Sequence, residues 1–313
     1  MISRNRSVIA ALTALGAWST HVDTASATEG GGNSYPIGVD NTFAGYMLPE
    51  GANWLLFYQH YSARDFKDNA GNNSPKFADF HLQADVIAPR LSYVWPGVRF
   101  LGANVETRVV QPVSAVDLTL GIARRAPLSP LDKGGQKTGL ADMSFSPVIL
   151  GWHGQSFHQT LGIETHLRTG SYDVSDNVNI GRNYNQVAPV YAFTWFPDAR
   201  SDVSAKFRYG LNDRNGATGY QSGDEASIEF SAGYRVLPQL LLGLNGYVYR
   251  QTTDDDLHGV TVPNSKGRVN ALGLFGSYRI TPKFAVTLRM QSEFGARNRP
   301  QGTRFWAMLL CPF

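Results

Sequence analysis

The chain has 313 residues, a formal net charge of +3 and a single cysteine, Cys311. One cysteine excludes an internal disulfide framework, and the small net charge without a basic cluster argues against nucleic-acid binding. No apolar run long enough for a membrane-spanning helix follows the first 27 residues, whereas glycine (32 residues) and aromatic side chains (12%) are abundant. This composition suits one large β-barrel or one to two ordinary domains.

The first 27 residues have the order of a secretory signal. Arg4 and Arg6 precede an apolar run, Val8–Trp18, and the following polar stretch ends in an alanine-serine-alanine triplet at 25–27. The apolar run is too short for a stable bilayer-spanning anchor. We therefore expect residues 1–27 to be a signal peptide that is removed after export, with a retained anchor as the alternative.

Apolar and polar side chains alternate with a period of two along the rest of the chain. In residues 203–211 the odd positions are mostly apolar or aromatic, and the even positions include Lys206 and Arg208. Residues 226–236 and 284–294 show the same pattern. Such segments are typical of β-strands with one apolar face. We predict strands at 53–64, 79–95, 98–124, 141–152, 157–169, 186–196, 200–212, 223–236, 239–251, 267–280, 283–294 and 303–313.

The connections between these strands alternate between short and long. WPG, HGQS, PDAR, LPQ and TPK predict tight turns, whereas the other connections, including GARNRPQG before the last strand, are long and polar. This alternation, which a soluble β-sandwich lacks, indicates an all-β fold: a transmembrane antiparallel β-barrel of about twelve strands over residues 53–313, with short periplasmic turns and long extracellular loops. Both ends then lie on the periplasmic side. Pro112 marks a bulge or a stretch protruding beyond the membrane.

The chain ends in an apolar run of strand length, RFWAMLLCPF. Phe305, Leu309 and Phe313 share one face in a period-two pattern, which we expect to face lipid in the closing strand. The terminal aromatic resembles the tail that bacterial barrel-assembly machinery reads. The sequence therefore predicts this machinery, lipid and lipopolysaccharide as partners in the outer membrane of a Gram-negative bacterium. Aromatic girdles at the two interfaces are expected from Trp54, Trp95, Trp152, Trp195 and Trp306.

Charged side chains on the polar strand faces are costly against lipid, so we expect them in the lumen. The lumen could be a polar passage with rings of charge, or a closed barrel filled by internal salt bridges. Both interpretations remain open at this point. The candidates are Glu164, His166, Arg168, Lys206, Arg208, Glu229, Arg289, Gln291 and Glu293, with Asp85 as a further one.

The segment before the first strand, residues 28–52, is rich in glycine and has no regular period. Its Tyr35, Phe43, Tyr46 and Met47 make it more apolar than a linker requires. We interpret it as a plug in the periplasmic mouth of the barrel, with a flexible leader as the alternative.

Signals for catalysis or metal binding are weak. His60 and Ser62 point the same way on a strand, but a catalytic triad also needs an orienting acid or amide. Residues 254–258, DDDLH, could hold calcium or bridge lipopolysaccharide phosphates through a divalent ion, although a solvated loop is the simpler interpretation. No GxSxG motif or zinc-ligand spacing is present. We predict no enzyme activity, no metal and no cofactor.

Three segments resemble a known outer-membrane family: EGGGNSYPIGVDNTFAGYMLP, NQVAPVYAFTW and RNRPQGTRFWAMLLCPF. That family is named for the meta-pathway of phenol degradation, and the resemblance covers nearly all of the chain after the signal. It implies a barrel that admits aromatic or hydrophobic compounds, and it transfers no binding residues. We predict a channel for passive uptake of such small molecules. The alternatives are a closed structural or adhesive barrel and an outer-membrane hydrolase.

Overall fold

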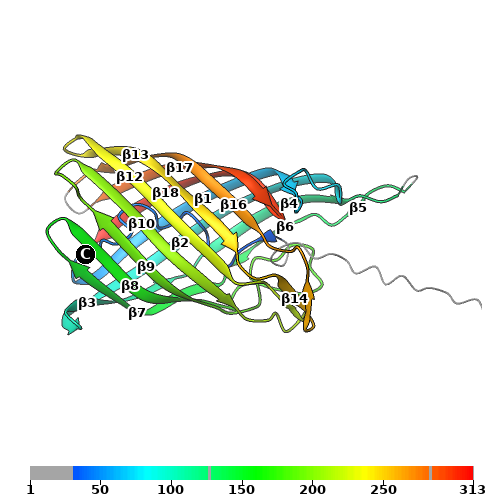
Figure 1. Cartoon of the computed structure of the whole chain (residues 1–313), viewed down its shortest axis with the longest axis horizontal. Coiled ribbons are helices and arrows are strands. Elements are labelled where there is room, and N and C mark those ends of the chain that lie inside the picture. Colours follow the sequence, from blue (N-terminus) through cyan, green and yellow to red (C-terminus); the bar gives the residue numbers. More distant parts are fainter. Residues whose placement is uncertain (1–30, 126–127, 282–283, 313) are drawn as a thin grey trace, which may run out of the picture.

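The computed structural model describes residues 31–125, 128–281 and 284–312, and the expected signal peptide and Phe313 lie outside them. Among the described residues, no helix is long and apolar enough to cross a membrane. The regular structure consists of antiparallel β-strands that curve into one barrel (Figure 1).

Twelve strands form the wall, and the last pairs with the first. β1 (Gly51–Lys67) pairs with β18 (Arg299–Pro312) from Asn53↔Pro312 to Lys67↔Arg299, and with β2 (Phe77–Phe100) on its other edge. This register closes the barrel, which confirms the predicted fold and strand number. The other wall strands are β3 (Ala103–Val110), β4 (Val113–Ile122), β6 (Gly135–Leu140), β7 (Met143–His153), β8 (Phe157–Leu167), β9 (Gln186–Trp195), β10 (Ser201–Asn212), β12 (Glu225–Leu237), β13 (Leu240–Gln251), β16 (Arg268–Arg279) and β17 (Ala285–Arg297).

Two wall strands are interrupted, so four of these elements form two strands. β3 and β4 both pair with β2 and are separated at Gln111–Pro112, where the proline has no N–H to donate. β6 and β7 continue each other across Ala141–Asp142 and pair with β4 and β3. Together with the short β5 (Leu131–Asp132), β4 and β6 extend beyond the other strands (Figure 1). Pro112 thus marks both a break and the start of a protruding hairpin.

The two barrel ends differ in their connections. We call the end with residues 68–76, 123–134, 168–185, 213–224 and 252–267 the long-loop end, and the opposite end the short-turn end. Two of the long loops pack together through a small sheet of β11 (Tyr220–Gln221), β14 (Asp255–Leu257) and β15 (Val260–Val262).

Two predicted connections are wrong in detail. Only Asn298, with a positive φ of 53°, separates β17 from β18, so GARNRPQG forms a tight hairpin instead of a long loop. The turn between β2 and β3 is Leu101–Gly102, where both residues have positive φ. WPG lies within β2, where the register shifts between Val94 and Arg99. Glycine and proline marked irregular backbone in both cases, but they did not distinguish a bulge or hairpin from a loop.

Aromatic side chains lie on the outer surface of the barrel at the short-turn end. Trp54, Trp95 and Trp195 are exposed there, and Trp152 donates from Nε1 to the Leu101 carbonyl. The expected girdle position of Trp306 is wrong. Its side chain points into the barrel, is 2% exposed and donates to Gln291 Oε1 at 3.1 Å, because even-numbered positions in this part of β18 face inward.

On β2 and β4 the two faces exchange character along the strand. Near the barrel middle, outward positions such as Ile87 and Val113 are exposed and apolar, as expected against lipid. Toward the long-loop end, the outward positions become polar, including Asp79, Gln83 and Thr119. The inward positions there become apolar, and they line a cavity. The exchange indicates that this part of the wall stands in water outside the membrane.

This boundary predicts that an outward arginine destabilises the barrel inside the membrane but has little effect outside it. Leu274, on the outer face of β16, is 68% exposed. We expect Leu274→Arg to destabilise the barrel by about 2–4 kcal/mol, the range for arginine near the bilayer midplane. Thr119→Arg should change stability by less than about 0.5 kcal/mol, as for other solvated surface sites. Urea unfolding of the protein in lipid vesicles measures both values, and equal losses would contradict the assigned boundary.

Candidate functional site

Residues 31–50 run through the barrel from one end to the other. At the long-loop end, Gly31 lies beside Phe66 and Pro300. At the short-turn end, the ring of Tyr46 lies 4.7 Å from that of His158, and Met47 packs against Val94. The segment therefore extends well beyond the periplasmic mouth in which the sequence placed it, and the described chain begins at the end opposite to β18's terminus.

The middle of this segment packs against one side of the lumen. Tyr35 and Ile37 join a buried cluster with Tyr247 and Tyr249 of β13. Tyr35 also donates its hydroxyl to Glu229, which accepts the Asp40 backbone N–H at 2.9 Å as well. These contacts fix residues 35–40 against the wall formed by β10 to β17.

One carboxylate of the segment lies among several basic side chains. Asp40 is 2.8 Å from Arg90 Nη1, 3.1 Å from Lys206 Nζ and 3.7 Å from Arg108 Nη1. Next to them, Glu164 contacts Lys206 at 3.1 Å and Arg208 at 3.4 Å. Asp40 of the segment thereby connects basic side chains from three strands of the wall, β2, β3 and β10.

A second buried cluster surrounds Glu293. Its carboxylate accepts hydroxyl hydrogen bonds from Tyr61 at 2.8 Å and Tyr247 at 2.5 Å, and the Gly302 N–H at 2.8 Å. Arg304 approaches it at 3.4 Å. These interior charges are paired, as expected for groups that have left water.

The structure brings most of the predicted lumen residues together inside the barrel. All are buried and face inward except Arg168 and Asp85, for which the prediction is wrong. β8 ends at Leu167, so the exposed Arg168 lies in the following loop, where its N–H donates to Asn185. Asp85 points outward and bonds to Tyr58 and His60. The inward residues are Glu164, His166, Lys206, Arg208, Glu229, Arg289, Gln291 and Glu293.

Residues of the other two predicted sets occupy different environments. Tyr35 and Met47 are buried in the lumen, Phe43 lies near the Phe196 ring, and Tyr46 is 48% exposed at the mouth. In the closing strand, Phe305 is exposed on the outer surface. Leu309 pairs with Leu56 of β1, whereas Phe313 lies outside the described residues.

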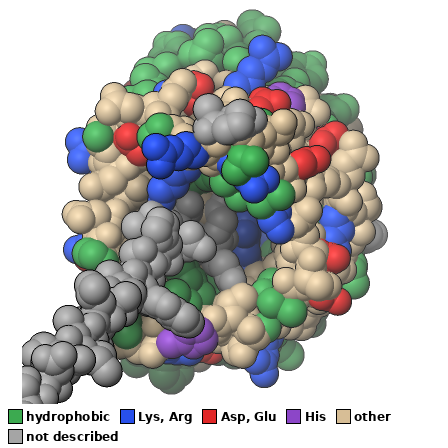
Figure 2. Space-filling model, turned by 90° about the vertical axis from the view of Figure 1, so that its right-hand side faces the viewer, with side chains coloured by type: hydrophobic (Ala, Val, Ile, Leu, Met, Phe, Trp, Pro, Cys, Tyr) green, Lys and Arg blue, Asp and Glu red, His purple; other side chains and the backbone are tan. Residues whose placement is uncertain are grey.

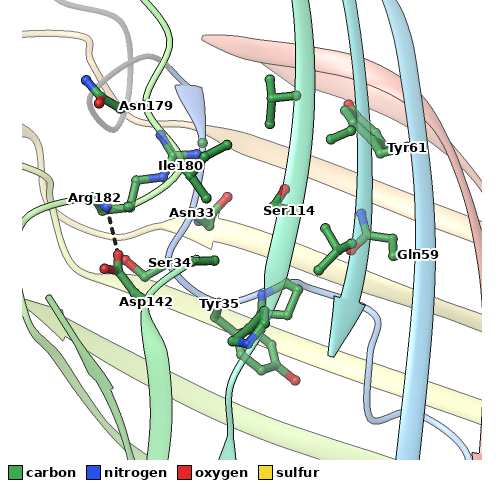
Figure 3. A pocket seen from close by; sticks show the side chains of 18 of the residues that line it. Asn33, Ser34, Tyr35, Gln59, Tyr61, Ser114, Asp142, Asn179, Ile180 and Arg182 are labelled. Atoms are coloured by element: carbon green, nitrogen blue, oxygen red, sulfur yellow. Dashed lines mark hydrogen bonds between the residues drawn. The ribbon is translucent and has the colours of Figure 1, made fainter. Parts of the chain in front are cut away.

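A cavity of about 690 Å³ lies between the segment and the wall formed by β1 to β4. Figure 3 shows Asn33, Ser34 and Tyr35 of the segment across this space from Gln59 and Ser114 of the wall. Figure 2 looks onto the long-loop end, where the surface is hollowed near its centre. The apolar part of the lining consists mainly of Phe66, Phe77, Phe80, Leu82, Val86, Val116, Leu118 and Leu120.

Residues 168–185 form another side of the cavity. Asp142, at the break between β6 and β7, accepts the N–H group of Gly170 at 2.9 Å. It also accepts that of Arg182 at 2.7 Å (Figure 3). These bonds hold both ends of the loop on the barrel rim. Within it, the Ser175 hydroxyl and N–H donate to Asp173 and hold the pKa of that exposed carboxyl below its usual value.

The prediction missed the wall residues that define the cavity. Positions 80, 82, 84, 86 and 88 are all apolar, opposite the polar positions 79, 81, 83 and 85, so the alternation was visible. Here the inward positions are apolar, whereas in the membrane part the outward positions are. This reversal was the signal that the prediction missed. Arg90, Arg108 and Arg304 were also missed. On β2 the charges occupy both faces, with Asp79 and Asp85 outward and Arg90 inward, so charge alone does not mark the lumen there.

Neither of the remaining chemical candidates lies in the cavity. His60 Nδ1 is 2.9 Å from Asp85 Oδ1 on the outer surface, and the described residues include no hydrogen bond between His60 and Ser62. Asp255 of the DDDLH loop is buried instead of solvated. It accepts hydrogen bonds from Tyr220 and from the Gly223 N–H, so it organises the loop. No group of possible metal ligands occurs in the described ranges.

The closed twelve-strand barrel, with its apolar outer belt and unequal ends, defines a transmembrane β-barrel of the outer-membrane type. Residues 63–309 match the family model described as "Putative MetA-pathway of phenol degradation". Because this match covers most of the chain, the protein belongs to that family. No curated protein sequence matches it.

Two solved structures illustrate the similarity in fold. An outer-membrane channel from Pseudomonas putida F1 is similar with a TM-score of 0.72 and 16% identity, over 86% of this chain and 98% of that one. The transport unit of the autotransporter AIDA-I from Escherichia coli is similar with a TM-score of 0.51 and 8% identity, over 88% of this chain and 95% of that one. At these identities the comparisons show the fold alone.

Asp142 offers a test of how the cavity wall is held. Asp142→Ala removes the acceptor of two backbone N–H groups, which should weaken the loop attachment by about 1–3 kcal/mol. We expect faster hydrogen exchange across residues 170–182, measured by mass spectrometry. Asp117→Ala, a matched change on the outer face of β4, should leave that exchange unchanged. Equal exchange in the two variants would refute the anchoring role.

Proposed function

We propose that the protein is a passive channel in the outer membrane of a Gram-negative bacterium for small hydrophobic or aromatic compounds. The long-loop end then faces the exterior and the short-turn end faces the periplasm, as in other barrels of this kind. Phe305, Leu309 and Phe313 would carry the signal read by the barrel-assembly machinery. Lipid and lipopolysaccharide would surround the outer belt.

The observation that carries this proposal is the apolar cavity at the long-loop end. A barrel for hydrophilic solutes is lined by polar side chains. In this barrel, β2 and β4 turn apolar side chains inward where their outer faces are in water. Exposing such a surface to an aqueous lumen is unfavourable by roughly 25 cal/mol per Å². An apolar solute entering from outside would cover it.

Phe66, Phe77 and Phe80 give the cavity an aromatic side. Their ring centroids are 4.9 Å apart for Phe66 and Phe77, and 5.6 Å apart for Phe66 and Phe80, with edge-to-face geometry. Aromatic rings at such distances attract one another through their quadrupoles. The ring of an aromatic solute can join the same edge-to-face arrangement. This favours aromatic solutes among the hydrophobic ones, in agreement with the family's association with phenol degradation.

Passage to the periplasm would require the segment of residues 31–50 to move. Beside Asp40 lies a second space of about 30 Å³, which is lined by Asp40, Ala44, Ile149 and Lys206 among others. That is far below the roughly 300–1,000 Å³ of ordinary small-molecule sites. The segment would therefore act as a plug. In a channel this plug moves, whereas in a permanently closed barrel, the alternative, it stays in place.

The primary test changes the cavity wall. Leu118→Asn places an amide on the apolar face, which should weaken solute binding by about 1–3 kcal/mol, as for other small changes in apolar pockets. We expect slower initial uptake of labelled toluene by cells carrying this variant than by cells carrying the wild type. Thr119→Asn, one residue away on the outer face, should behave as the wild type. Equal uptake by cells with and without the protein would refute the proposal.

Removing the plug gives a second test. Deletion of residues 33–50 should raise single-channel conductance in a planar bilayer, because the segment runs through the lumen from one end to the other. Heat-modifiable migration on gels provides the control for correct folding. Unchanged conductance in the folded deletion variant would show that the segment does not obstruct the pore.

A further inference from the structure

We infer that the cavity binds amphipathic organic carboxylates, with the carboxylate at Arg90 and Arg108 and the hydrocarbon body along β2 and β4. The inference rests on the proposed function, since it names the class of compound that would use the same cavity. It also gives Asp40 a second role, as the chain's own carboxylate that occupies this anion site when no ligand is bound.

The cavity wall changes from apolar to basic along its length. Arg90 and Arg108 lie at the inner end of the apolar faces, and the pairs Arg90↔Val110 and Ser92↔Arg108 place them on adjacent strands. A strand rises about 3.3 Å per residue, so β2 covers about 33 Å between Phe80, at the outer end of the apolar face, and Arg90. The face is formed by Phe80, Leu82, Ala84, Val86 and Ala88 of β2 with Val116, Leu118 and Leu120 of β4.

Three basic side chains share the carboxylate of Asp40, and two of them have a second acidic partner. Arg90, Arg108 and Lys206 all approach Asp40. Arg108 also contacts Glu106 at 2.8 Å, and Lys206 contacts Glu164. Among the acidic side chains of the described residues, Arg90 forms an ion pair with Asp40 only, through its Nη1 atom.

Arg90 therefore retains capacity for a further carboxylate. Its Nε is buried and has no hydrogen-bond partner among the described residues. A guanidinium binds a carboxylate best through two parallel N–H donors, whereas Asp40 engages a single nitrogen at 2.8 Å. Because Nε has almost no accessible surface, a ligand carboxylate from the cavity would gain this forked geometry once Asp40 has moved aside and the guanidinium has turned toward the cavity.

Such a ligand would compete with Asp40. If its carboxylate takes Arg90 and Arg108, Asp40 keeps only Lys206 among its three basic neighbours. The segment would then lose the contacts that join it to β2 and β3. An uncharged compound of the same shape can fill the apolar part of the cavity but cannot replace Asp40.

The test compares 4-phenylbutanoate with 4-phenylbutanamide, which share one hydrocarbon body. Calorimetric titration of the folded protein in an uncharged detergent measures both affinities. We expect the carboxylate to bind about tenfold or more tightly, as for hydrogen bonds to a charged group. Equal affinities, or tighter binding of the amide, would overturn the inference.

Three variants locate the effect. Arg90→Gln should abolish the preference for the carboxylate, and Asp40→Asn should strengthen carboxylate binding by removing the competitor. Arg250→Gln is the matched control, because Arg250 bonds to Asn270 and to the Tyr249 and Val269 carbonyls outside the cavity lining. If Arg90→Gln does not fold, the Asp40→Asn result decides: unchanged carboxylate affinity in that variant would overturn the competition.

Uptake by cells and binding by the purified protein together separate this inference from the proposed function. Uptake of labelled toluene without any carboxylate preference would refute the anion site and leave the channel intact. A carboxylate preference in the purified protein, with no uptake of toluene or of 4-phenylbutanoate by cells, would support the anion site and refute the channel.

Discussion

The ion pairs of Asp40 are the constraint on which the interior depends. Arg90, Arg108 and Lys206 come from three parts of the wall, and all are largely removed from water. Loss of one member of a buried ion pair typically costs about 3–5 kcal/mol, because a charge is then left without a partner. The segment of residues 31–50 is therefore part of the electrostatic core of the barrel, and a movement of it must provide these cations with another anion.

The same segment divides the lumen into two unequal halves. Tyr35 and Ile37 pack against β13, and Arg289 donates to the Val39 carbonyl at 2.8 Å, so this half is filled. The half next to β1 to β4 remains open as the cavity. A twelve-strand barrel is wider than one that its own side chains can fill, and narrower than an open porin. The segment uses the excess space and leaves the wall of β1 to β4 open to the cavity.

The errors of the sequence interpretation concern the environment of a strand face, the end of a strand and a period that was not applied. Asp85 was assigned to the lumen because a charge should avoid lipid, yet at its height the outer face is in water and Asp85 bonds to His60 there. Arg168 continues the inward period of Glu164 and His166 beyond the end of β8. Trp306 was expected near a strand end, but it lies within β18 on the face opposite to Phe305, and that face turns inward.

The sequence by itself determined the barrel, its approximate strand number, its unequal ends and most of its inward charges. These properties depend on local alternation and on turn residues, which are readable within a few positions. Only the tertiary structure decided that residues 31–50 traverse the lumen, that Asp40 meets cations from β2, β3 and β10, and that β2 and β4 form an apolar wall above the membrane. These features arise from contacts between residues far apart in the chain, and from the height of each residue relative to the bilayer, which alternation does not encode.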